Sequence, residues 1–182
     1  MLLTKVTHRL LLLVFISSFS LSASAADDRA IFDQSLGDYS EELLEAEDQG
    51  KKGILLFFEM DECPFCHRMK TTVLNQPEVM RYFKKNFLIF AVDIEGDIEI
   101  SDFKGQTMTM KDFSLKHNRV RATPVFAFFD LKGKRIARYT GPTSGVEEFM
   151  WLGEYVVDGH YNKQRFTKFK RQKRKEKKNN KG

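Results

Sequence analysis

An unbroken apolar segment followed closely by two cysteines is the feature that most restricts the fold of this chain. Residues 53–58 read Gly-Ile-Leu-Leu-Phe-Phe, and Cys63 and Cys66, the only cysteines of the chain, come shortly afterwards. Because the segment is apolar at every position rather than at alternate ones, it predicts a strand buried on both faces of a sheet. A loop and then the start of a helix follow such a strand, so the sequence places the cysteine pair at a helix N-terminus.

The spacing of these cysteines favours a reactive pair over a structural cross-link. A disulfide between Cys63 and Cys66 closes a very short loop, so it removes little conformational entropy from the unfolded chain. The free N–H groups and the positive dipole end of a helix N-terminus stabilise an anion, and the thiolate is the nucleophilic form of cysteine. We therefore expect Cys63 to be the nucleophile and Cys66, within one helical turn, to be the resolving thiol. Pro64 suits the first turn, where its missing N–H is not needed.

The same residues also admit two other sites. Residues 63–67 read Cys-Pro-Phe-Cys-His, the C-x-x-C-H pattern of covalent haem attachment, in which His67 would be an axial ligand. Apolar strands on both sides of the motif are not needed to hold a haem, so we disfavour this interpretation. A zinc site is weaker, because the cysteines with His67, His117 or His160 do not form a recognised ligand spacing. We expect no metal ion and no cofactor, and we expect His67 to be an exposed residue beside the thiols.

The rest of the chain predicts one domain of alternating helices and strands. Asp38 and Glu41 resemble a capping box that opens a helix, which Gly50 would end. The other predicted elements are helices at 68–74 and from 77 onwards, a strand at 87–93, a hairpin insertion at 94–110, a short helix at 111–117, strands at 123–130 and 135–139, and a helix after Ser144. Strands alternating with helices indicate a parallel pair, and the late hairpin adds an antiparallel edge. The pattern predicts an α/β fold with a mixed central sheet flanked by helices.

The N-terminal residues 1–25 have the pattern of a secretory signal. Lys5 and Arg9 precede an apolar run from Leu10 to Leu21, and a small-residue cleavage site, Ala-Ser-Ala, ends at Ala25. The run is shorter than the roughly 20 apolar residues that span a bilayer. We therefore expect cleavage after Ala25 and export to the periplasm, with retention as an anchor as the alternative.

The C-terminal residues 163–182 form a basic tail on an acidic body. The tail contains eleven Lys or Arg and one Glu, a net charge of +10, whereas residues 26–162, the predicted domain, carry −7. Runs of like charge are usually solvated, so we expect a disordered tail. Grouped basic residues also bind anionic surfaces, so an anionic membrane surface is a possible partner, and export makes nucleic acid an unexpected one.

The order of these motifs resembles the thioredoxin superfamily over roughly residues 40–158. A strand, a C-x-x-C helix, the pair Thr123-Pro124 before another strand, a glycine-containing hairpin turn and a last helix follow one another. Within the superfamily, residues 102–105 (Asp-Phe-Lys-Gly) and 120–124 (Val-Arg-Ala-Thr-Pro) are similar to exported bacterial thioredoxin-like proteins of the SoxW type.

This resemblance implies a thioredoxin fold and a thiol–disulfide oxidoreductase that acts on protein disulfides. It implies a cis Thr123–Pro124 bond placed against the cysteine pair, where Thr123 and Pro124 contact the substrate. It also implies a reductant supplied by a membrane thiol carrier, and we expect a monomer because no separate dimerisation domain is present. A non-catalytic binding module built on the same scaffold is the alternative function.

Two departures from typical thioredoxins affect proton transfer. Glu62 replaces the tryptophan before the first cysteine, and Phe57 replaces a buried aspartate six residues before it. The proton acceptor for the resolving thiol is therefore open, with Glu59 or water as candidates. Glu59, Asp61 and Glu62 form either an acidic approach, which disfavours a thiolate, or a solvated loop. The candidate modulators of the pair are Glu59, Pro64, Phe65 and His67.

Overall fold

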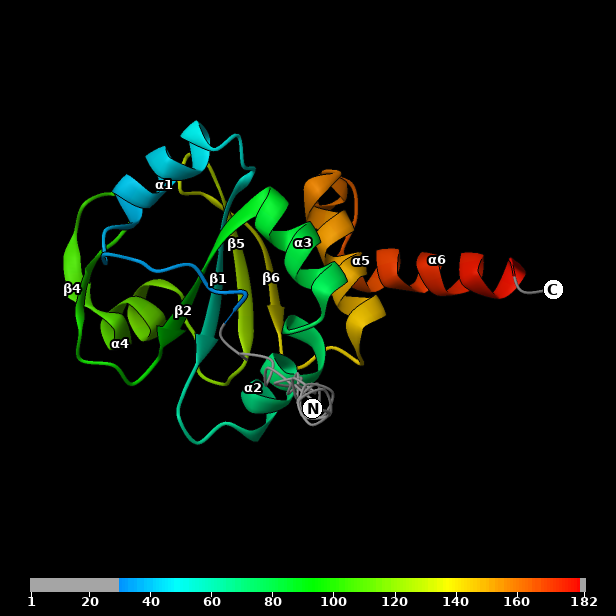
Figure 1. The fold of residues 1–182 in the computed structure, drawn as a ribbon, viewed down its shortest axis with the longest axis horizontal. Helices are drawn as coiled ribbons and strands as arrows, with labels where there is room; N and C mark the ends of the chain where they lie inside the picture. The colour runs from blue at the N-terminus through cyan, green and yellow to red at the C-terminus, as the bar shows by residue number, and fades with distance from the viewer. Residues whose placement is uncertain (1–29, 181–182) are drawn as a thin grey trace, which may run out of the picture.

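Four strands form the central sheet of this protein, for which a computed structural model describes residues 30–180 (Figure 1). The strand order is β2 (Phe87–Asp93), β1 (Gly53–Glu59), β5 (Val125–Asp130) and β6 (Arg135–Thr140). β1 runs parallel to β2 and antiparallel to β5, and β6 is antiparallel to β5. The predicted mixed sheet is confirmed, whereas the signal expected at 1–25 lies outside the described residues.

Strand β1 lies in the middle of the sheet because its side chains are apolar on both faces. Residues 54–58 are each at most 1% exposed. Leu55 and Phe57 face one core, while Ile54, Leu56 and Phe58 face the other. In the antiparallel register with β5, Phe58 lies opposite Val125, so the end of β1 lies beside the start of β5.

Three helical segments cover the face of the sheet that carries Phe57. They are α2 (Pro64–Met69), which continues as the π-helix η1 (Lys70–Leu74), then α3 (Pro77–Asn86) and α5 (Val146–Val157). Phe149 of α5 stacks on Phe83 of α3 with ring centroids 4.4 Å apart. A Cβ at Gly153 would lie 2.8 Å from the Phe83 ring, so glycine at this position lets α5 approach α3 closely.

Helix α1 and the insertion between β2 and β5 cover the opposite face. The carboxylate of Asp38 accepts hydrogen bonds from the backbone N–H groups of Ser40 and Glu41, which confirms the predicted helix start. Tyr39 packs against Phe113 of the insertion, with ring centroids 5.3 Å apart. The insertion predicted at 94–110 is a two-stranded antiparallel sheet. The bounds of these elements are α1, Tyr39–Asp48; β3, Glu99–Ser101; β4, Thr107–Thr109; α4, Met110–Asp112; and η2, Phe113–His117.

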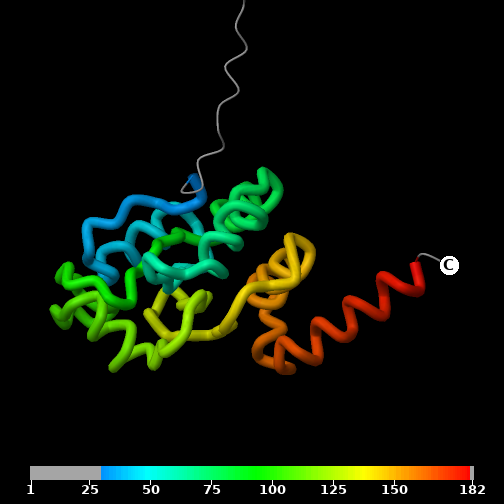
Figure 2. The backbone as a smooth tube through the Cα atoms, turned by 90° about the horizontal axis from the view of Figure 1, so that it is seen from below, coloured from blue at the N-terminus to red at the C-terminus, as the bar shows by residue number. Residues whose placement is uncertain are grey.

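The basic tail differs from the sequence expectation. After the short helix η3 (His160–Asn162), residues Phe166–Asn179 form helix α6, which runs outward from the body (Figures 1 and 2). The prediction of disorder is therefore wrong over these residues. The physical reason is that Phe169 is buried against Tyr155 of α5, and acidic residues of α5 pair with cations of α6. A run of like charges can be ordered where another element supplies the opposite charge.

Candidate active site

The two cysteines form a disulfide at the start of α2. Their Cα atoms are 5.2 Å apart and their sulfur atoms are 2.08 Å apart. Cys63 is the N-cap residue, with an extended backbone, and Pro64 is the first residue of the helix. The helix begins at residue 64, so the predicted position of the cysteine pair at a helix N-terminus is confirmed, and Cys63 lies where the helix N–H groups are free.

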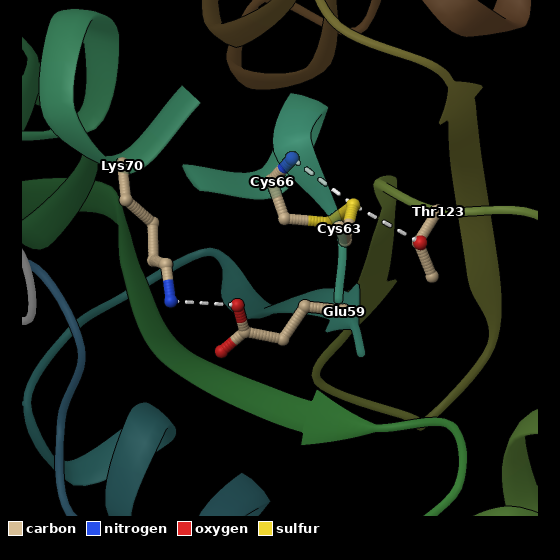
Figure 3. The surroundings of a disulfide bond; sticks show 5 residues. All are labelled: Glu59, Cys63, Cys66, Lys70 and Thr123. Atoms are coloured by element: carbon tan, nitrogen blue, oxygen red, sulfur yellow. Dashed lines mark hydrogen bonds and ion pairs between the residues drawn. A yellow bond between two sulfur atoms is a disulfide. The ribbon is translucent and has the colours of Figure 1, made fainter. Parts of the chain in front are cut away.

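Two donors converge on the sulfur of Cys63 (Figure 3). The backbone N–H of Cys66 donates to Cys63 Sγ at 3.1 Å, and Thr123 Oγ1 donates to the same atom at 3.2 Å. Donors that point at a sulfur stabilise its anionic form once the disulfide opens. Cys63 is 7% exposed and Cys66 is 1% exposed, so Cys63 is the sulfur that an incoming group can reach.

The residues before β5 complete the surroundings of the disulfide. The Thr123–Pro124 peptide bond is cis, as the resemblance implied. Pro124 is buried and Thr123 is partly buried. The carbonyl of Pro124 accepts a hydrogen bond from the N–H of Gly141 at 2.8 Å, which holds the start of β5 to the end of β6. The hydrogen bond from Thr123 to Cys63 thus joins residues 60 positions apart in the chain.

An ion pair lies below the disulfide in Figure 3. Lys70 Nζ is 2.9 Å from a carboxylate oxygen of Glu59, and their side chains are 14% and 20% exposed. Phe57 is buried and packs on Phe126, so the place of the thioredoxin aspartate holds an aromatic ring. Glu59 was predicted from the sequence as a candidate modulator, whereas its partner Lys70 was not. A signal was available, because Lys70 follows Cys66 by four positions and therefore lies on the same helix face.

The remaining candidate modulators lie at the solvent-facing edge of the site. Phe65 is 53% exposed, which is unusual for a large aromatic side chain. His67 is exposed on α2, as expected, and so are Asp61 and Glu62 in the preceding loop. The acidic approach is therefore partly neutralised at Glu59 by Lys70 and open to water at the other two carboxylates.

Residues 30–180 hold neither a ready-made metal cluster nor a membrane-spanning helix. Within this range no group of three or more His, Cys, Asp or Glu side chains is placed to hold a metal ion. The helices of the same range are too short or too polar to cross a bilayer.

Comparison with known proteins gives a family for the whole domain. A family model described as "Thioredoxin-like domain" matches residues 39–157, which is more than half of the chain. A search of curated proteins found no match.

Similar solved structures agree with the family match. A thioredoxin-fold protein from Helicobacter pylori is 23% identical, with a TM-score of 0.59, and the alignment covers 79% of this chain and 89% of that one. A thioredoxin from Thermus thermophilus is 25% identical, with a TM-score of 0.52 and coverages of 68% and 88%. A protein described as DsbH oxidoreductase is 19% identical, with a TM-score of 0.53 and coverages of 70% and 85%. The expected fold, a mixed sheet flanked by helices, is confirmed.

Proposed function

This chain belongs to the thioredoxin-like domain family, and we propose that it is an exported thiol–disulfide oxidoreductase that reduces disulfides in other proteins. The fold and the Cys63–Cys66 pair support the general class of thiol–disulfide oxidoreductase. The observation that carries the proposal is the convergence of the Cys66 N–H and the Thr123 hydroxyl on Cys63 Sγ, which is the more exposed sulfur.

The proposed reaction transfers two electrons from the dithiol to a substrate disulfide. The Cys63 thiolate attacks one substrate sulfur, the substrate S–S bond breaks, and one substrate thiolate leaves. A mixed disulfide now joins Cys63 to the substrate. Cys66 loses its proton and attacks Cys63 Sγ, which forms the observed intramolecular disulfide and releases the second substrate thiolate. Thr123 and Pro124, which lie beside Cys63, would contact the substrate backbone during both steps.

We propose that the carboxylate of Glu59 accepts the proton that Cys66 loses before it attacks the mixed disulfide. Phe57 has no group that can accept a proton, whereas Glu59 lies at the end of β1 near the disulfide, with Lys70 holding its carboxylate. Replacing Glu59 by Gln keeps the side-chain shape and removes the acceptor, so resolution of the mixed disulfide should slow by about tenfold or more. Attack by Cys63 should be nearly unchanged, and equal slowing of both steps would argue against this role.

The direction, location and partners of the reaction follow from the sequence patterns. The resemblance to proteins of the SoxW type favours a reductant that receives electrons from a membrane thiol carrier. The N-terminal pattern favours a periplasmic, cleaved protein. We also propose that the protein works as a monomer.

The reduction potential of the Cys63–Cys66 couple tests the direction. The domain is equilibrated in glutathione redox buffers and the fraction of disulfide is measured. A value near about −250 mV or lower supports a reductant, and one near about −150 mV contradicts the proposed direction. If the couple does not titrate as a two-electron pair, the oxidoreductase class itself fails.

Two serine variants test the roles of the cysteines. Cys63→Ser should lower the rate of disulfide reduction by at least about 1,000-fold, because no thiolate remains at the exposed position. Cys66→Ser should instead accumulate the mixed disulfide, which mass spectrometry detects. A Cys63→Ser protein that retains its biological effect would favour the non-catalytic binding module. A Soret band in protein produced by export would favour the haem interpretation.

A further inference from the structure

Helix α6 presents two basic faces that differ in their contacts. One face is turned to α5, where Lys170 and Arg174 pair with the buried carboxylate of Glu148 at 2.7 and 3.2 Å. Lys173 pairs with Glu154 at 2.7 Å, and Lys177 pairs with Glu147. Phe166 and Phe169 lie on the same side, against Tyr155. This inner face attaches the helix to the body.

The outer face of α6 is defined here by Lys168, Arg171, Lys175 and Lys178. Their spacing of three, four and three residues places them in one stripe along the helix. All four side chains are exposed, and none of them forms an ion pair with another residue in the described range 30–180. The stripe extends over about 15 Å, at 1.5 Å per residue.

The position of the helix leaves this stripe accessible. α6 projects from the body (Figures 1 and 2), and its contacts with α5, including that of Lys177 in the last turn, are made by the inner face. The acidic residues of α5 are engaged by the inner face, so their charge is already compensated there. The outer face thus carries four positive charges that are not compensated by acidic residues of α5, and the helix holds them at a fixed spacing.

We propose that the outer face of α6 binds the surface of an anionic phospholipid bilayer through charge alone. Grouped Lys and Arg side chains on a helix are attracted to anionic headgroups. The apolar side chains of α6 pack inward, so the helix has no apolar face with which to enter the hydrocarbon region. The stripe also has no aromatic residue on which a nucleobase could stack, and the N-terminal pattern predicts export, so lipid is the favoured polyanion. This inference goes beyond the proposed redox function and does not depend on it, because no cysteine takes part.

Vesicle binding of residues 26–182, which contain every described element, tests the proposal. The protein is sedimented with vesicles of phosphatidylglycerol mixed with phosphatidylcholine, and separately with pure phosphatidylcholine. We expect binding to the anionic vesicles alone, and release when the salt concentration is raised to about 0.5 M, since salt screens exposed charges. Replacing Lys168, Arg171, Lys175 and Lys178 by Gln should lower the partition coefficient by about 100-fold or more.

A matched variant separates the stripe from net charge. Lys52, Lys104, Lys132 and Lys134 are exposed residues of the body, and replacing all four by Gln changes the net charge by the same amount. This control should change the partition coefficient by less than about threefold. An equal loss in the control would overturn the proposal, and so would equal binding to pure phosphatidylcholine. Tighter, stripe-dependent binding to a double-stranded DNA oligonucleotide would assign the stripe to nucleic acid and would also overturn it.

Discussion

Helices α2 and α6 are attached to the same domain by different forces. Cys66 and Met69 of α2 are buried in the core between the sheet and α5, with exposures of 1% and 0%. α6 buries only Phe169 and otherwise relies on ion pairs at its inner face. The hydrophobic effect stabilises most where water is fully excluded, whereas ion pairs that include an exposed side chain, as at Arg174 and Lys177, contribute less. The reactive helix should therefore be as stable as the whole domain, and α6 should be able to detach alone.

The largest effect should come from the core beneath α2. Met69→Ala removes a fully buried side chain and leaves a cavity, which should lower the free energy of unfolding by about 3 kcal/mol. The measurement is urea denaturation followed by circular dichroism. Because α2 is part of the core, its unfolding and that of the sheet should shift to lower urea concentration by the same amount. A loss below about 1 kcal/mol would show that α2 is held more loosely than its burial indicates.

The attachment of α6 should respond to the loss of one carboxylate. Glu148 is 3% exposed and accepts hydrogen bonds from Tyr139, Ser144 and Lys170. Glu148→Gln removes the charge that two cations of α6 use, at a cost of about 2 kcal/mol. The helix should open locally, so trypsin should cleave it several-fold faster while the sheet remains folded. If α6 and the rest of the domain unfold at the same urea concentration, α6 does not detach alone and the difference between α2 and α6 is contradicted.

Acid should weaken the same contact. Burial disfavours the charge of Glu148, but hydrogen bonds from Lys170, Ser144 and Tyr139 outweigh burial and hold its pKa below the ordinary 4.5. A folded-state pKa below the unfolded one stabilises the fold above about pH 4.5, and this contribution is lost as the pH falls through the folded value. Urea denaturation between pH 7 and pH 3 should show this loss in the wild type. Glu148→Gln should have a flatter profile, and identical profiles would exclude Glu148 as its source.

The smallest effect should come from the outer face of α6. Arg171→Gln changes an exposed residue of the stripe and should alter the free energy of unfolding by less than about 0.5 kcal/mol. The neighbouring Lys170→Gln should cost more, since Lys170 donates to Glu148 and lies near the rings of Tyr139 and Phe166. Thermal unfolding of the two variants compares the faces directly. Equal shifts would mean that the two faces of α6 do not differ energetically.

The sequence predicted those elements whose structure is determined by the local apolar pattern or by the chemistry of neighbouring residues. The buried strand at 53–58, the cap at Asp38 and the insertion at 94–110 depend on neighbours in the chain. The cysteine pair was assigned from its place after that strand, and the cis Thr123–Pro124 bond followed from the family resemblance.

The parts that the sequence did not predict depend on partners distant in the chain. Nothing in residues 163–182 alone shows that Glu148 and Glu154 will neutralise one side of the tail. Likewise, Lys70 was expected in a helix, but its pairing with Glu59 at the end of β1 depends on how that helix packs beside the strand. Charge pairing needs the three-dimensional arrangement, because the energy of a pair depends on distance and exposure rather than on sequence spacing.

The proposed activity requires the correct register between β1 and β5, because this register sets the position of Thr123 relative to Cys63. Phe58 lies opposite Val125, and this pairing brings Thr123 within 3.2 Å of the Cys63 sulfur. A slip of one residue would move Thr123 by about 3.4 Å along the strand and turn its side chain to the other face. Such a misaligned molecule could bury nearly as much apolar surface, since both faces of β1 are apolar. It would nevertheless lack the hydroxyl beside its reactive sulfur, so stability and activity can be lost separately.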